Sequence, residues 1–134
     1  MLVFVYGTLT DPDVAGSVLD SFAYRGRATL AGLGRVDGTY PTLSPGGETP
    51  SRLLETDEVA LLDRYEGIAD GLYVRVSVPV RGVGNSNAGA ERAETYVGDP
   101  DRLGAPATWS GDSRLPDRVR AYVRENDVHL RPEI

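Results

Sequence analysis

Cysteine and lysine are absent from the sequence, and histidine occurs once, as His129. The lack of cysteine excludes disulfide bonds, thiolate metal sites and cysteine nucleophiles. His129 lies in a polar segment without a supporting motif, so we expect it on the surface and not in a catalytic triad. No apolar run approaches the ~20 residues of a membrane span, and Met1 leads into an apolar segment without a basic signal region. We therefore expect a cytoplasmic protein without a membrane partner.

Acidic side chains outnumber basic ones by 20 to 14, which gives a net charge of −6. The phosphates of a nucleic acid would be repelled by this charge, and no basic patch interleaved with aromatic residues is present. The glycines match neither a P-loop nor a dinucleotide-binding fingerprint. Asp57, Glu58 and Asp63 suggest either a cation site or a solvated helix face, and the acidic composition favours the second. We expect no nucleic-acid partner and no metal site.

The pattern of apolar residues predicts one domain, residues 1–134, built from short elements. The expected strands are 3–6, 24–36, 52–55, 72–80 and 93–97. The expected helices are 13–19, 56–66 and 116–125. The expected loops and irregular segments are 46–50, 82–89 and 99–113. The expected strand at 24–36 contains several glycines, a pattern typical of a bulged strand that bends a sheet. Because strands outnumber the short helices, we predict an α+β fold, a small mixed β-barrel with short peripheral helices.

The segment Val3–Leu9 begins with apolar and aromatic residues and then reaches the dipeptide Gly7-Thr8. This pattern indicates a buried strand that runs into a tight turn at the surface. A glycine turn of this kind lets successive N–H groups face outward, where they can bind an anion or an oxyanion. The alternative is an ordinary strand that ends in a loop, and these seven residues alone favour that alternative.

Glu66 falls on or beside the apolar face of its predicted helix, for which Thr56 is the expected N-cap. It also precedes Gly67, a typical residue for the position after a helix end. Burial and the helix dipole both disfavour a negative charge there, so we expect a pKa raised toward the range of a proton shuttle. The alternative is a structural ion pair with Arg64, Arg75 or another arginine. Periodicity does not decide between the two.

Three motifs occur in a fixed order along the sequence. They are Val3-Phe4-Val5-Tyr6-Gly7-Thr8-Leu9, Leu62-Asp63-Arg64-Tyr65-Glu66-Gly67 and Tyr73-Val74-Arg75. This ordered set resembles the γ-glutamylcyclotransferase-like (AIG2-like) family, and the resemblance is strongest over residues 2–98. Residues 99–134, expected as an irregular segment plus a C-terminal helix, carry no matching motif. In that segment Trp109 either covers a pocket or packs in the core, and packing is favoured.

The resemblance implies a small mixed barrel whose acid/base residue is Glu66. It also implies a substrate pocket formed by Tyr6, Gly7, Thr8, Leu9, Tyr73 and Tyr96. Taken without the resemblance, Tyr73 is slightly better explained by ordinary cross-strand packing than by substrate contact.

The activity that the resemblance implies is cyclisation of a small γ-glutamyl amine or amino acid to 5-oxoproline, with release of the amine. This chemistry needs no cofactor, because the attack is intramolecular and one carboxyl group can move the proton. A second enzymatic version releases the amine from a larger γ-glutamylated molecule. The alternative from another class is a non-catalytic barrel that binds a small amino-acid-like ligand. The oligomeric state stays open.

Overall fold

A computed structural model describes residues 1–81 and 91–133, and six strands within these ranges form a single sheet. The strands are β1 (Leu2–Val5), β2 (Ala23–Val36), β3 (Thr42–Glu55), β4 (Tyr73–Pro79), β5 (Arg92–Gly98) and β6 (His129–Pro132). The helices are α1 (Pro12–Val18), α2 (Val59–Tyr65), α3 (Pro100–Leu103) and α4 (Leu115–Glu125), with 3₁₀ turns η1 (Thr8–Thr10) and η2 (Ile68–Asp70). The strand order is β4-β5-β1-β3-β2-β6.

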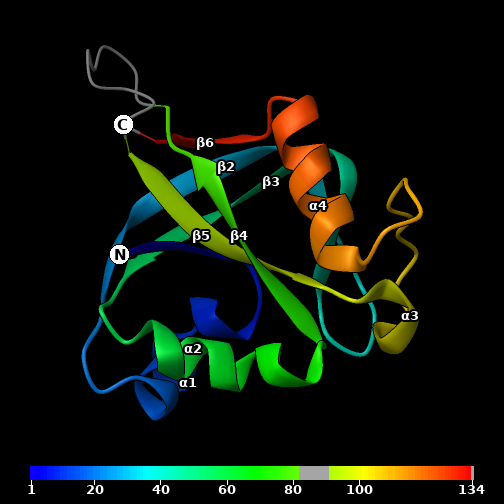
Figure 1. The fold of residues 1–134 in the computed structure, drawn as a ribbon. Coiled ribbons are helices and arrows are strands. Elements are labelled where there is room, and N and C mark those ends of the chain that lie inside the picture. Colours follow the sequence, from blue (N-terminus) through cyan, green and yellow to red (C-terminus); the bar gives the residue numbers. More distant parts are fainter. Residues whose placement is uncertain (82–90, 134) are drawn as a thin grey trace.

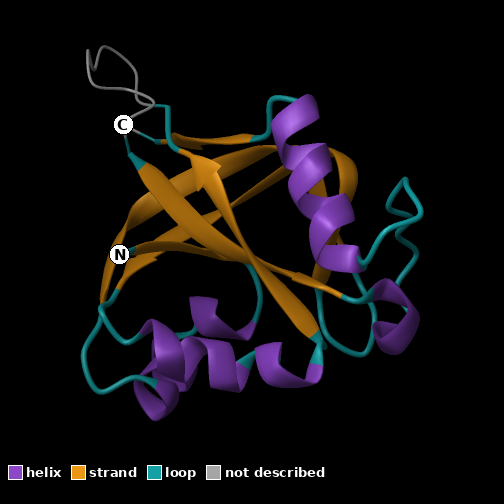
Figure 2. Ribbon diagram, viewed as in Figure 1, coloured by secondary structure: helices purple, strands orange, loops and turns teal. Residues whose placement is uncertain are grey.

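The sheet curls until its two edge strands approach each other (Figure 1). β1 runs parallel to β5, and the other neighbouring strands are antiparallel. The register of β2 against β3 shifts near Gly26 and Gly32, which have positive φ angles, and such bulges bend a strand. Val80, just after β4, then bridges Leu130 of β6. The predicted α+β architecture is therefore confirmed as a curled mixed sheet, close to a barrel, with short helices outside it (Figure 2).

Strand β1 lies between β5 and β3 in the middle of the sheet and is buried on both of its faces, because an apolar core covers each face. Phe4 points into one apolar core, and Val3 and Val5 point into the other. This placement explains why β1 is a continuous apolar run and shows no alternation with polar residues. The chain can become polar only after Val5, where the strand ends and the turn to η1 begins.

The two cores are covered by different helices. The core inside the curl is closed by α4, whose Val119 and Val123 pack among strand residues such as Phe4 and Leu30. The core on the other face is closed by α1 and α2, which contribute Ala15 and Leu62 and lie next to each other in Figure 1. This second core continues into the cavity described below.

Trp109 belongs to the core inside the curl and is 3% exposed. Its ring packs edge-to-face against Tyr122 of α4. It does not line the cavity near Glu66. The packing interpretation of this residue is therefore the correct one.

The predicted exposed loop at 46–50 was wrong, whereas the strand predicted at 52–55 is confirmed as the end of a longer strand. Both belong to the 14-residue strand β3, which pairs with β2 along most of its length. Gly46 and Gly47 have positive φ angles and indicate a turn from local sequence alone. The pairing with β2 overrides that local preference, because it satisfies the backbone groups on both sides of the two glycines.

The predicted helix at 56–66 begins later than expected. α2 starts at Val59, and the Thr56 hydroxyl accepts a hydrogen bond from the Glu58 N–H at 3.1 Å ahead of the helix. Thr56 therefore shapes the turn before α2 and is not its N-cap. The end of the helix is as predicted, because Gly67 follows it with a left-handed φ of 71°.

The segment after residue 98 contains more structure than the expected irregular stretch and one helix. α3 interrupts the stretch after Asp99, whose side chain accepts from the Asp101 N–H and caps the helix. β6 follows α4 and pairs with β2. The predicted loop at 82–89 lies outside the described residues. None of the described helices is both long enough and apolar enough to cross a membrane.

The tight packing of β2 against the turn before β6 gives a test of the fold. A Cβ atom at Gly32 would lie 2.9 Å from Val128 Cγ2, whereas a Cβ atom at Gly26 would contact nothing within 4 Å. Both glycines have positive φ, +98° and +89°, so alanine strains the backbone at either position. We expect Gly32→Ala to lower the free energy of unfolding by about 1 kcal/mol more than the control Gly26→Ala, measured by urea denaturation. Equal losses would contradict this packing.

Candidate active site

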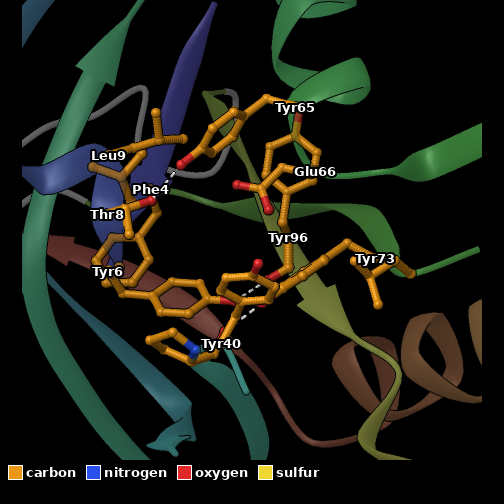
Figure 3. Close-up of a pocket in the computed structure, with 13 residues that line it drawn as sticks. Phe4, Tyr6, Thr8, Leu9, Tyr40, Tyr65, Glu66, Tyr73 and Tyr96 are labelled. Carbon is orange, nitrogen blue, oxygen red and sulfur yellow. Dashed lines mark hydrogen bonds between the residues drawn. The ribbon is translucent and has the colours of Figure 1, made fainter. Parts of the chain in front are cut away.

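A cavity of about 250 Å³ opens where β1 ends. It is bounded by the turn after β1, the end of α2 and the facing strands β4 and β5 (Figure 3). Its lining residues are Phe4, Val5, Tyr6, Gly7, Thr8, Leu9, Tyr40, Pro41, Tyr65, Glu66, Leu72, Tyr73 and Tyr96. All seven residues that the sequence analysis selected are in this set. The fold thus brings together positions up to 90 residues apart, and their chemical roles remain predictions.

The turn after β1 lines the cavity and contains backbone N–H groups that have no backbone partner among the described residues. Gly7 precedes the 3₁₀ turn η1, which is closed by the Thr10 N–H donating to the Gly7 carbonyl at 3.1 Å. The N–H groups of Gly7, Thr8 and Leu9 donate to no backbone carbonyl within residues 1–81 and 91–133. Leu9 is buried beneath the turn and fixes its position. Three donors therefore remain available beside the cavity.

Glu66 stands at the end of α2, and its carboxylate points into the cavity (Figure 3). Among the described residues it forms no ion pair within 4.0 Å. Arg75, one of the expected partners, instead lies 3.7 Å from Asp63 and 3.6 Å from Glu94. Arg64, the other, is exposed and forms no ion pair in the described chain. The structure therefore gives no support to the structural ion pair.

Burial raises the pKa of the Glu66 carboxyl from 4.5 to about 7. Among the residues that line the cavity, Glu66 is the one with a charged side chain, so no cation there offsets the cost of ionisation. A carboxyl group with this pKa is present in both protonation states near neutral pH. It is therefore able to accept a proton and to return it.

Three tyrosine hydroxyls of the cavity have their protons engaged elsewhere in the protein. Tyr6 donates to the carbonyl of Tyr96, Tyr73 donates to the carbonyl of Pro41 at 2.6 Å, and Tyr96 donates to Asp63 Oδ1 at 2.8 Å. Burial raises the pKa of all three phenols above the usual value, and the Glu66 carboxylate contributes further. They therefore stay neutral, and their oxygens act toward the cavity as hydrogen-bond acceptors.

The orientation of Tyr73 depends on close packing around Gly98. A Cβ atom there would lie 3.0 Å from Tyr73 Cε2 and 2.3 Å from Leu103 Cδ1. The Gly98 N–H donates to the buried Thr42 hydroxyl at 2.7 Å. A residue larger than glycine would therefore displace the wall of the cavity.

Tyr40 and Tyr65 also line the cavity, and neither was among the site residues predicted from the sequence. Their side chains are 54% and 44% exposed, so they lie at its opening. The Tyr65 hydroxyl is 2.7 Å from the Thr8 hydroxyl and thus joins α2 to the turn after β1 (Figure 3). The quoted motifs contained Tyr65 but not Tyr40, and nothing in the local sequence distinguished either tyrosine from a packing residue.

His129 lies in β6 and does not line the cavity. Its Nδ1 atom is 2.7 Å from the carbonyl oxygen of Asp127, in the turn before the strand. Within the described ranges, no group of three or more histidine, aspartate or glutamate side chains is arranged to hold a metal ion. Glu66 is therefore the side chain in the cavity best suited to proton transfer.

The raised pKa of Glu66 predicts a dependence of stability on pH. Because the folded state binds this proton more tightly than the unfolded state, the stability due to Glu66 is present below pH 4.5 and is lost as the pH rises through about 7. Glu66→Gln removes this term. We expect the free energy of unfolding of the variant relative to wild type to increase by about 3 kcal/mol between pH 4.5 and pH 8, measured by urea denaturation. A difference that does not change with pH would show that Glu66 has an ordinary pKa.

Comparison with known proteins shows the same family over most of the chain. Residues 3–114 match the family model described as "Gamma-glutamyl cyclotransferase, AIG2-like". AIG2-like protein A of Arabidopsis thaliana is 35% identical in a match that covers 76% of this chain and 66% of that protein. This chain therefore spans 66% of the length of that curated relative.

Solved structures share the fold. A gamma-glutamyl cyclotransferase superposes with a TM-score of 0.59 at 20% identity, over 74% of this chain and 66% of that chain. An uncharacterized Homo sapiens protein superposes with a TM-score of 0.60 at 16% identity, over 90% of this chain and 96% of that chain. The solution structure of an Arabidopsis thaliana protein superposes with a TM-score of 0.54 at 30% identity, over 93% of this chain and 84% of that chain. The family model matches well over half of the residues of this chain, and the chain therefore belongs to the gamma-glutamyl cyclotransferase, AIG2-like family.

Proposed function

We propose that the protein cyclises a small γ-glutamyl amine or amino acid to 5-oxoproline and releases the amine, with Glu66 as general acid and base. One observation carries the proposal: a partly buried carboxyl group with a pKa of about 7 lines the same cavity as residues 7–9, whose three N–H groups donate to no backbone carbonyl among the described residues. Membership of the family supports the same type of reaction.

The polar groups of the cavity match the two charged ends of a γ-glutamyl group. The oxygens of Tyr6, Tyr73 and Tyr96, together with the Glu66 carboxylate, form an acceptor-rich wall suited to an α-ammonium. The N–H groups of the turn after β1 suit an anionic oxygen, either the substrate carboxylate or the oxyanion that forms during reaction.

The reaction needs two protons to move, one after the other, because the attacking nitrogen begins as an ammonium and ends as the N–H of a lactam, and the leaving nitrogen begins as an amide N–H and ends as an ammonium. The ionised Glu66 carboxylate accepts a proton from the α-ammonium, and the free α-amine attacks the γ-carbonyl carbon. A C–N bond forms, and N–H donors of the Gly7-Thr8 turn stabilise the tetrahedral oxyanion. The intermediate then collapses: Glu66 gives its proton to the departing nitrogen and the original γ-amide C–N bond breaks. The regenerated Glu66 carboxylate takes the second proton from the attacking nitrogen, now in the ring, and passes it to the released amine. The products are 5-oxoproline and the free amine, and no water is consumed.

The released amine has a place near the opening of the cavity. Leu72 and Pro41 give the cavity apolar wall area, and Tyr40 and Tyr65 flank its exposed side. An aliphatic or aromatic amine can therefore extend toward solvent past the two tyrosines. A larger γ-glutamylated molecule would have to project through the same opening.

The activity test compares wild type with Glu66→Gln on a panel of γ-glutamyl amino acids and γ-glutamyl amines, with 5-oxoproline as the measured product. We expect the variant to lose roughly 10²- to 10⁴-fold in kcat/KM, because it can neither take nor return the proton. The wild-type kcat/KM is expected to rise with pH through about 7, since the ionised carboxylate starts the reaction.

Tyr122→Phe serves as a matched control, because its hydroxyl donates to the Gly32 carbonyl in the other core and lies outside the cavity. It is expected to retain the wild-type kcat/KM. Activity that survives Glu66→Gln would refute the proposed role of this residue. Tight binding of γ-glutamyl compounds without turnover by wild type would instead identify a non-catalytic binding barrel.

A further inference from the structure

A second hollow, of about 410 Å³, lies between α4, the far half of β4 and the start of β5. It shares no lining residue with the cavity that contains Glu66. Its lining residues are Val76, Ser77, Pro79, Arg81, Arg92, Arg120, Val123, Arg124, Asp127 and Val128. α4 forms one side of the hollow and packs against β4, as Figure 1 shows. The proposed cyclisation makes no use of this region.

Arginine dominates the polar lining of the hollow. Arg120 and Arg124 are one turn apart on the same face of α4. Arg81 follows β4 and Arg92 begins β5, and the register of these antiparallel strands places them at the same end of the pair. Four guanidinium groups and one carboxylate, Asp127, give this hollow a charge of 4 − 1 = +3. The whole chain, by contrast, carries −6.

Most of these guanidinium groups have no carboxylate partner among residues 1–81 and 91–133. Arg81 pairs with Asp127, which leaves three cations. Arg92 donates to the Ser77 hydroxyl at 2.8 Å, a neutral acceptor. Arg120 reaches only a backbone carbonyl at 3.5 Å, and Arg124 forms no ion pair or hydrogen bond in the part of the chain that the structure describes.

The segment that joins β4 to β5 contains one acidic residue, Glu91, which forms no ion pair within the described residues. Residues 82–90 read Gly-Val-Gly-Asn-Ser-Asn-Ala-Gly-Ala and contain no acidic side chain. Exposed arginines elsewhere on the sheet do lie against carboxylates. Arg25 is 2.6 Å from Glu55, and Arg131 is 2.9 Å from Glu48. The hollow thus gathers positive charge that the fold neutralises at other positions.

Like charges gathered on a concave surface repel one another and concentrate the field in the hollow. The planar fork of a guanidinium matches the oxygen pairs of phosphate and carboxylate groups. Val76 and Val123 provide an apolar floor beneath the arginines. We propose that this hollow binds a small multivalent oxyanion, which Arg92, Arg120 and Arg124 hold together.

The test is calorimetric titration of the protein with pyrophosphate and, separately, with citrate, at constant ionic strength set by sodium chloride. We expect saturable binding of one stoichiometric equivalent. The double variant Arg120→Gln/Arg124→Gln is expected to weaken it at least about tenfold, because two of three free cations are lost. Tighter binding of pyrophosphate would identify a phosphate ligand, and tighter binding of citrate a polycarboxylate ligand.

The double variant Arg25→Gln/Arg27→Gln is the matched control, since it removes the same charge from β2, outside the hollow. It is expected to bind like wild type, and thermal unfolding verifies that both double variants are folded. Failure of wild type to bind either anion would overturn the proposal. Equal weakening in the two double variants would also overturn it, because the effect would then reflect net charge alone. Neither outcome bears on the cyclisation activity.

Discussion

The place where β1 leaves the interior determines where the candidate active site forms. β1 is buried on both faces, so its residues are apolar and its backbone groups are used by β3 and β5. Within the described residues no strand pairs with β1 beyond Val5, and the N–H groups of Gly7, Thr8 and Leu9 donate to no backbone carbonyl there. The parallel pairing with β5 brings Tyr96 beside this turn, and the antiparallel pair β4–β5 adds Tyr73.

The second constraint is the burial of Glu66. A pKa of about 7 means that the charged form is disfavoured by on the order of 3 kcal/mol relative to an exposed glutamate, a large fraction of the stability of a small domain. A nearby arginine would remove this penalty, yet Arg75 is held by Asp63 and Glu94. Asp63 also accepts the Tyr96 hydroxyl. One carboxylate thus keeps the arginine away from Glu66 and orients a tyrosine of the cavity.

Local sequence patterns were sufficient to predict the elements whose burial is periodic or continuous. β1, β4 and α4 follow directly from apolar runs, alternation and helical spacing. Helical spacing also placed Glu66 at the end of its helix and beside the apolar face, and Gly67, with its positive φ, marks that end. The bulges of β2 were also foreseeable, since its glycines interrupt an otherwise strand-like segment.

Elements that depend on partners distant in sequence were not predictable. The first half of β3 contains Pro45, Gly46 and Gly47, which locally favour a turn, and only the pairing with β2 makes it a strand. The four residues of β6 are too few and too polar to show a pattern. Tyr40 and Tyr65 join the cavity through the curl of the sheet, which brings separate segments together. The arginine hollow was not predictable either, because its lining residues come from separate segments, β4, β5 and α4.

The most direct test of this account is the pKa of Glu66 itself. Carbon-13 NMR of the side-chain carboxyl, with Glu66→Gln to assign the resonance, measures its titration without substrate. The account predicts a midpoint near pH 7, raised by burial beside the uncharged tyrosines. A midpoint at or below about 4.5 would show that the carboxylate is solvated or paired, and a proton shuttle at this residue would then lose its physical basis.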